Sequence, residues 1–167
     1  MKFSDIVKLY ESEQSGPPYI VTDAYGDKFY YKNTENTILH REDGPAIIRF
    51  GSGAREWWKD GKLHREDGPA VERQDGGEEW YINHKRHRDG GPAFYLPGVA
   101  EYWYRHGKLH REDGPAAITP SDSQWALNDR YLTPDEVKEL KNKLTIKKEI
   151  QGHKNNRIDP RMLEDYL

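Results

Sequence analysis

The chain has 167 residues, a formal net charge of -3 and no cysteine. Its length favours one domain, the near balance of 29 acidic and 26 basic residues argues against nucleic acid as a partner, and the lack of cysteine excludes disulfides and thiolate metal sites. Because no apolar run approaches the ~20 residues of a membrane span, or forms a signal peptide, we expect a soluble, cytoplasmic protein.

The N-terminal segment predicts an amphipathic helix at roughly residues 3–13. Phe3, Ile6, Val7 and Tyr10 follow the i, i+3, i+4, i+7 spacing of one helix face. A Ser-Gly-Pro-Pro linker follows at residues 15–18. Residues 1–18 therefore form the first expected segment.

A repeated motif organises the second segment, residues 19–132. LHREDGPA stands at residues 39–46, 63–70 and 109–116, and the variant RHRDGGPA stands at residues 86–93. A tryptophan lies seven residues before three of the four motif histidines, and Trp125 continues that series. Self-similarity at a period of about 23 residues predicts a repeat architecture.

Each unit predicts two strands and two turns. In the second unit, residues 55–59 are aromatic and alternate with charge, and a second strand is expected at residues 70–72. The dipeptide Asp60-Gly61 between them is typical of a two-residue hairpin turn, and Asn83-His84 and His106-Gly107 take its place in later units. We therefore expect a mainly β protein, an elongated antiparallel meander of about nine strands.

The third segment, residues 133–167, predicts a helical cap. Thr133, Pro134 and two acidic residues form a helix start, and Val137, Leu140 and Leu144 share one face. A helix at roughly residues 134–148 would cover the open end of the sheet, and a shorter helix is expected at residues 159–167.

The unit resembles the MORN repeat, a β-hairpin module of about 23 residues. The segment EWYINHKRH at residues 79–87 is closest to the family's aromatic opening. The His-Arg-x-Asp-Gly-Pro-Ala closing departs from the family's glycine-rich one and resembles a variant of bacterial and phage proteins. The resemblance implies a binding array, a scaffold, adaptor or inhibitor, located in the host cytoplasm if a phage encodes the chain.

The His-Arg pairs are candidates for chemistry, yet we interpret them as structural. Equivalent residues two strands apart are separated by ~10 Å, too far to share one metal ion, and a catalytic site copied four times is implausible. In this interpretation the motif aspartates stabilise the turn, the His and Arg side chains bond to backbone of neighbouring hairpins, and the glycine before each proline supplies an unusual backbone angle. The structural set is His40, Arg41, His64, Arg65, His87, Arg88, His110 and Arg111.

The paired aromatics give the candidate binding site. Residues 57 and 58 and their equivalents alternate between the two faces of a strand, so each face carries an aromatic row. The row that the tryptophan series leaves to solvent is expected to contact another protein. Its residues are Trp58, Tyr81 and Tyr104, with Lys59 and Arg105 beside them.

The expected function is therefore non-enzymatic protein binding, with no cofactor and no metal, and with self-association as a further option. Two alternatives stay open. One is a small-ligand or nucleotide binder, in which an arginine holds phosphate beside stacked aromatics. The other is a hydrolase that uses the motif His and Asp residues, although the sequence has no nucleophile motif.

Overall fold

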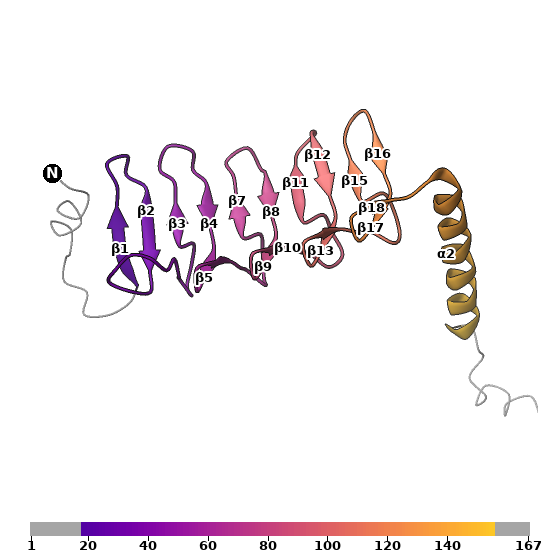
Figure 1. Ribbon diagram of the computed structural model, residues 1–167, viewed down its shortest axis with the longest axis horizontal. Coiled ribbons are helices and arrows are strands. Elements are labelled where there is room, and N and C mark those ends of the chain that lie inside the picture. The colour runs from indigo at the N-terminus through magenta and orange to yellow at the C-terminus, as the bar shows by residue number, and fades with distance from the viewer. Residues whose placement is uncertain (1–17, 156–167) are drawn as a thin grey trace, which may run out of the picture.

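The fold is mainly β, with one long antiparallel sheet and a C-terminal helix. The computed structural model describes residues 18–155, and the helices expected at residues 3–13 and 159–167 lie outside them. Ten strands follow one another along the long axis in chain order (Figure 1). They are β1 (Tyr19–Thr22), β2 (Lys28–Tyr31), β3 (Ile47–Ile48), β4 (Arg55–Glu56), β7 (Val71–Glu72), β8 (Glu78–Glu79), β11 (Phe94–Leu96), β12 (Ala100–Tyr102), β15 (Ala117–Ile118) and β16 (Ser123–Gln124).

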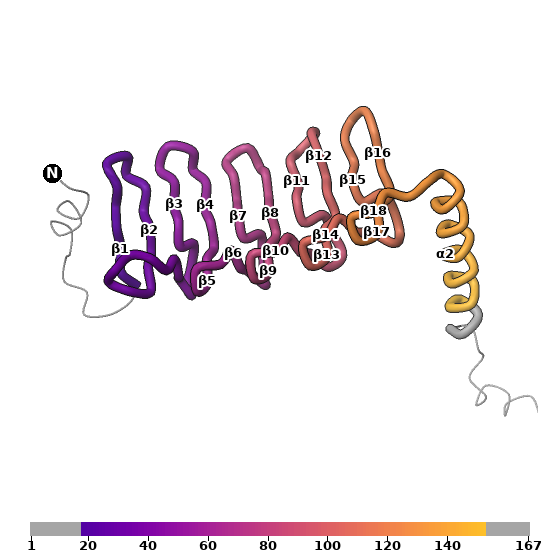
Figure 2. The backbone as a smooth tube through the Cα atoms, viewed as in Figure 1, coloured from indigo at the N-terminus to yellow at the C-terminus, as the bar shows by residue number. Residues whose placement is uncertain are grey.

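Four short hairpins form a second layer beside the lower edge of this sheet. Figure 2 shows them as a row of small loops, one after each pair of long-sheet strands from β3–β4 onward. Neighbouring hairpins are bonded to each other, as where the His84 N–H donates to the Leu63 carbonyl at 2.8 Å. The hairpins are β5 (Trp58–Lys59) with β6 (Lys62–Leu63), β9 (Tyr81–Ile82) with β10 (Lys85–Arg86), β13 (Tyr104–Arg105) with β14 (Lys108–Leu109), and β17 (Ala126–Leu127) with β18 (Arg130–Tyr131).

The prediction of one continuous strand at residues 55–59 is wrong, because the strand is interrupted at Trp57. The Trp57 N–H donates to the carbonyl of Ala70, directly before β7 of the long sheet, at 2.8 Å, and its own carbonyl accepts from the N–H of His64, directly after β6 of the hairpin, at 3.0 Å. The chain therefore changes pairing partners at this residue and leaves one sheet for another. The expected nine-strand single layer is instead eighteen short strands within the described residues.

The hairpin turns have the predicted backbone. Both turn residues have positive φ, as at Asp60 (49°) and Gly61 (73°), and at Asn83 (50°) and His84 (65°). This left-handed conformation is that of the type I′ turn, whose twist matches the flanking strands.

The most deeply buried residues are alanines. The alanine that closes each motif is completely buried, and so is the alanine at the start of β17. No larger side chain is fully buried among the described residues, so the interior is thin and aliphatic bulk is small. The five completely buried alanines are Ala46, Ala70, Ala93, Ala116 and Ala126.

The long sheet keeps one register from end to end, which gives it two distinct faces. One row of directly paired residues contains most of the apolar side chains, and the next row contains most of the charged ones. The first row is Val21, Phe29, Ile47, Glu56, Val71, Glu79, Phe94, Tyr102, Ala117 and Gln124.

The C-terminal helix α2 (Pro134–Asn155) begins where predicted and continues beyond the expected residue 148. Thr133 and Glu136 form a reciprocal cap: the Thr133 N–H donates to the Glu136 carboxylate at 2.9 Å, and the Glu136 N–H donates to Thr133 Oγ1 at 3.4 Å. Figure 1 shows α2 standing beside the last strands of the sheet. In residues 18–155, no helix has the length and apolar character required to cross a membrane.

Candidate functional site

A groove lies where the apolar face of the long sheet meets the hairpin layer. In each hairpin the first and last residues pair across the strands, so their side chains share the side that faces the groove. The hollow is centred on the second and third units and is open to solvent. It is lined by Arg49, Ser52, Ala54, Glu56, Leu63, Val71, Arg73, Gln74, Asp75, Glu79 and Tyr81.

The three predicted aromatics, Trp58, Tyr81 and Tyr104, belong to this groove side and form the aromatic row. All three are half-buried. The indole N–H of Trp58 donates to Glu56 at 2.9 Å, and the Tyr81 hydroxyl donates to Glu79 at 3.0 Å. Carboxylates of the sheet thus orient Trp58 and Tyr81, and Tyr81 lines the hollow.

Lys59 and Arg105 lie on the opposite side of the same hairpins. They follow Trp58 and Tyr104 in their strands, and successive side chains point to opposite faces. Both are exposed. The structure therefore divides the five predicted binding residues between two surfaces.

The third unit adds a charged cluster that the sequence reasoning missed. Glu79 is only 6% exposed, and its carboxylate accepts hydrogen bonds from Arg86 at 2.6 Å, from Tyr81 and from Arg73. Arg86 occupies the place that leucine holds in the other three motifs, as Leu63 does in the second. That departure from the repeat was the available signal.

Burial and charge act in opposite directions in this cluster. Desolvation disfavours the charged form of Glu79, but the bonds from Arg86 and Tyr81 outweigh it and lower the pKa of the carboxyl below its ordinary value. Burial, and then the charge of Glu79, raises the pKa of Tyr81 to about 12. Glu79 is therefore held ionised and Tyr81 protonated over a wide pH range.

Aromatic rings surround Arg86 on the groove side of its hairpin. Its guanidinium carbon lies 5.5 Å from the ring centres of Tyr81 and Phe94, and 5.6 Å from that of Tyr104. Cation–π contacts of this kind fix a charged side chain between apolar surfaces. The third unit thus places one anchored positive charge and one anchored negative charge beside the aromatic row.

The motif arginines serve the other face of the sheet. Arg41, Arg65, Arg88 and Arg111 lie 3.9–4.1 Å above the rings of Tyr30, Trp57, Trp80 and Trp103. Each donates to the carbonyl of the proline four residues later, within its own loop, at 3.2–3.4 Å. The prediction that these arginine side chains bond to neighbouring hairpins is therefore wrong, because their contacts stay inside each unit.

The glycines of the motif have a different purpose from the predicted one. Gly68 and its equivalents do not have positive φ, so the backbone angle does not require glycine. A Cβ added to Gly68 would lie 2.6 Å from the guanidinium carbon of Arg65, and at Gly114 the distance to Arg111 would be 2.7 Å. The arginine passes directly over the glycine, so a larger residue there would displace the guanidinium from its position above the aromatic ring.

The motif histidines connect each unit to the next. Nδ1 of His64 accepts the N–H of Asn83 at 3.2 Å, and His87 accepts that of His106 at 3.3 Å; His40 and His110 make the same contact with Asp60 and Asn128. The donor is always the first residue of the following hairpin turn, so the same contact recurs at all four histidines. Within residues 18–155, no group of three His, Cys, Asp or Glu residues could hold a metal ion.

The chain was compared with protein-family models, curated proteins and solved structures, and none of the three comparisons finds a match.

Proposed function

We propose that the chain is a non-enzymatic protein-binding module built from MORN-like hairpin repeats, and that its groove receives the partner through the aromatic row. The observation that carries this proposal is the row itself: Trp58, Tyr81 and Tyr104 hold equivalent positions on the groove side of three hairpins, and Tyr81 lines the hollow. Large amphipathic rings on a rigid support are the side chains that dominate protein interfaces.

The rigidity of the support favours binding. The long sheet has no register break, and the hairpins are bonded both to their own unit and to the next. Partner binding would therefore order few additional groups, which lowers its entropic cost. The anchored charges of Glu79 and Arg86 would add specificity, because a wrong partner would leave them unmatched.

The contacts of the four motifs support the repeat interpretation. Each motif repeats the same arginine–aromatic stack and the same histidine contact to the following turn. The last unit lacks a motif arginine, and Lys141 of α2 lies 5.4 Å above the ring of Trp125 in its place. On this proposal α2 closes the array by supplying the missing cation.

Two matched double variants test which surface binds. Trp58→Ser with Tyr104→Ser alters the groove, and Lys59→Ser with Arg105→Ser alters the opposite side of the same two hairpins. Each would be immobilised beside the unaltered chain and exposed to lysate of the native host, with captured proteins identified by mass spectrometry and folding checked by melting. The proposal expects the groove variant alone to lose a partner. Retention of every partner by a folded groove variant would refute it.

A further inference from the structure

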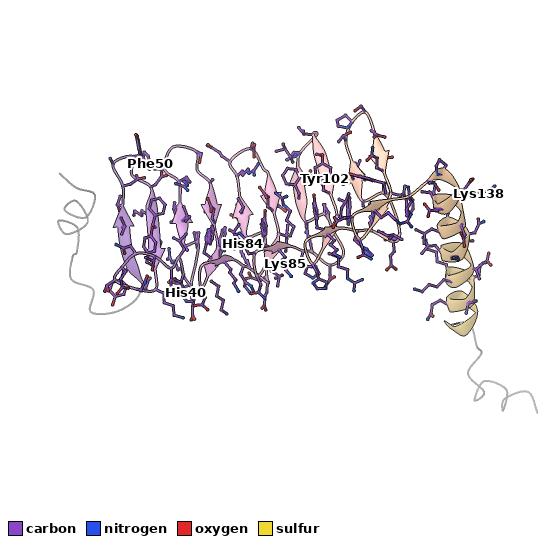
Figure 3. All side chains as sticks on the ribbon, viewed as in Figure 1. His40, Phe50, His84, Lys85, Tyr102 and Lys138 are labelled. Atoms are coloured by element: carbon purple, nitrogen blue, oxygen red, sulfur yellow. The ribbon has the colours of Figure 1, made fainter. Side chains whose placement is uncertain are left out.

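The outer side of the hairpin layer is strongly basic. Five cations project from three consecutive hairpins, away from the groove: Lys59, Lys62, Lys85, Arg105 and Lys108, which we name the outer basic row. All five are exposed, and none takes part in an ion pair within residues 18–155. Figure 3 labels Lys85 on this lower layer.

The row contains unfavourable like-charge pairs. Lys59 is directly paired with Lys62, and Arg105 with Lys108, in non-neighbouring hairpins. Like charges opposite one another in an antiparallel pair destabilise the sheet. The one carboxylate of these three hairpins, Asp60, does not relieve them, because it is engaged by Lys32 at 2.6 Å and by His40 at 3.2 Å.

This segregation is hidden in the overall net charge of -3. The exposed carboxylates of the motif loops, Glu42, Glu66, Asp89 and Glu112, lie 3.4–3.8 Å from Nε2 of the motif histidines, whose Nδ1 atoms contact the hairpin turns. A balanced composition argues against a polyanionic partner only if the charges are mixed on the surface. Here the outer side of three hairpins carries five exposed cations along the axis of the sheet, and the one carboxylate of these hairpins is already engaged.

We propose that the outer basic row binds the phosphate backbone of a nucleic acid duplex, independently of base sequence. Equivalent strands are two positions apart, so the hairpins follow at ~10 Å and the row is ~20 Å long. That length corresponds to about six base-pair steps of 3.4 Å. Flexible lysine stems reach individual phosphates, and the released counterions supply the binding free energy.

This surface is distinct from the groove, and its test is independent of the proposed groove function. Binding of a short fluorescein-labelled DNA duplex would be measured by fluorescence anisotropy over a series of salt concentrations. Five phosphate contacts predict a slope of log Kobs against log salt of about -4 to -5. The groove variant Trp58→Ser with Tyr104→Ser should keep this binding.

A charge-reversed variant and a matched control locate the surface. Lys62→Glu with Lys85→Glu and Lys108→Glu leaves two cations, so the slope should fall to about -2 and the affinity at low salt should fall at least about tenfold. The control is the same change at three exposed lysines of α2: Lys138, Lys143 and Lys147. This control changes the net charge by the same amount. It should bind the duplex more tightly than the charge-reversed variant does and should keep the slope of the unaltered chain.

Folding provides a second measurement. Lys62→Glu and Lys108→Glu turn the two like-charge pairs into opposite-charge pairs, so the charge-reversed variant should melt no lower than the unaltered chain while it loses the duplex. The proposal is overturned if the unaltered chain does not bind the duplex at low salt, if both triple variants weaken binding equally, or if the chain binds polyglutamate in preference to the duplex, which would indicate an acidic protein partner.

Discussion

Replacing Arg86 by leucine tests whether the buried charge of Glu79 depends on Arg86 for its stability. The change gives this motif the leucine of the other three, yet it should destabilise the protein. Glu79, 6% exposed, would lose its 2.6 Å bond from Arg86. It would keep the Tyr81 hydroxyl at 3.0 Å and the contact from Arg73.

The size of the stability loss depends on the contacts that Glu79 keeps in this variant. Breaking a buried ion pair costs about 3–5 kcal/mol, and losing one hydrogen bond to a charged group costs about 1.5–3 kcal/mol. Because Arg73 still neutralises Glu79 in part, we expect a loss of about 2 kcal/mol in the free energy of unfolding. The neighbouring Lys85→Leu, on the exposed outer side, should change it by less than about 0.5 kcal/mol.

The fourth unit supplies the compensating change. It has Tyr102 where the third has Glu79, and Leu109 where the third has Arg86. The double variant Glu79→Tyr with Arg86→Leu should therefore return to within about 1 kcal/mol of the unaltered chain, because no charge is left buried. Urea unfolding of both single variants and of the double variant gives the coupling free energy. Wild-type stability of Arg86→Leu, or additive effects in the double variant, would refute this reasoning.

The remaining predictions concern the interior, the histidines and pH. Ala93→Leu should lower stability by about 1–3 kcal/mol, because a completely buried alanine has no space beside it; unchanged urea unfolding would contradict this. His64→Ala should cost about 1–3 kcal/mol through the lost bond from Asn83, whereas unchanged melting with complete loss of function would make the histidine functional. The lowered pKa of Glu79 means that its contribution is complete above about pH 4.5 and is lost as the pH falls; Glu79→Gln should flatten that part of the acid unfolding curve. Since the pKa of Tyr81 is raised to about 12, stability should fall as the pH rises above 10, and Tyr81→Phe should remove a step near pH 12 from the tyrosinate absorbance titration.

Some features were predictable because they depend on neighbouring residues alone. The hairpin turns follow from dipeptides such as Asp60-Gly61, which accept positive φ, and the start of α2 follows from the cap of Thr133 and Glu136. The mainly β fold follows from aromatic segments between regularly spaced turns. The recurrence of the motif residues is likewise visible in the sequence itself.

Only the tertiary structure decided how these parts are combined. The break at Trp57 depends on two bonds to residues outside its own strand, and alternation of side chains then separates Trp58 from Lys59. The cluster joins Glu79 to Arg73, six residues before it, and to Arg86, seven residues after it and in the other layer, so a strand pattern read residue by residue could not reveal it. Net charge, likewise, is a sum over the chain and contains no information about position. Local preferences determined the turns and strands of this protein, whereas the pairing of those strands in three dimensions determined its surfaces.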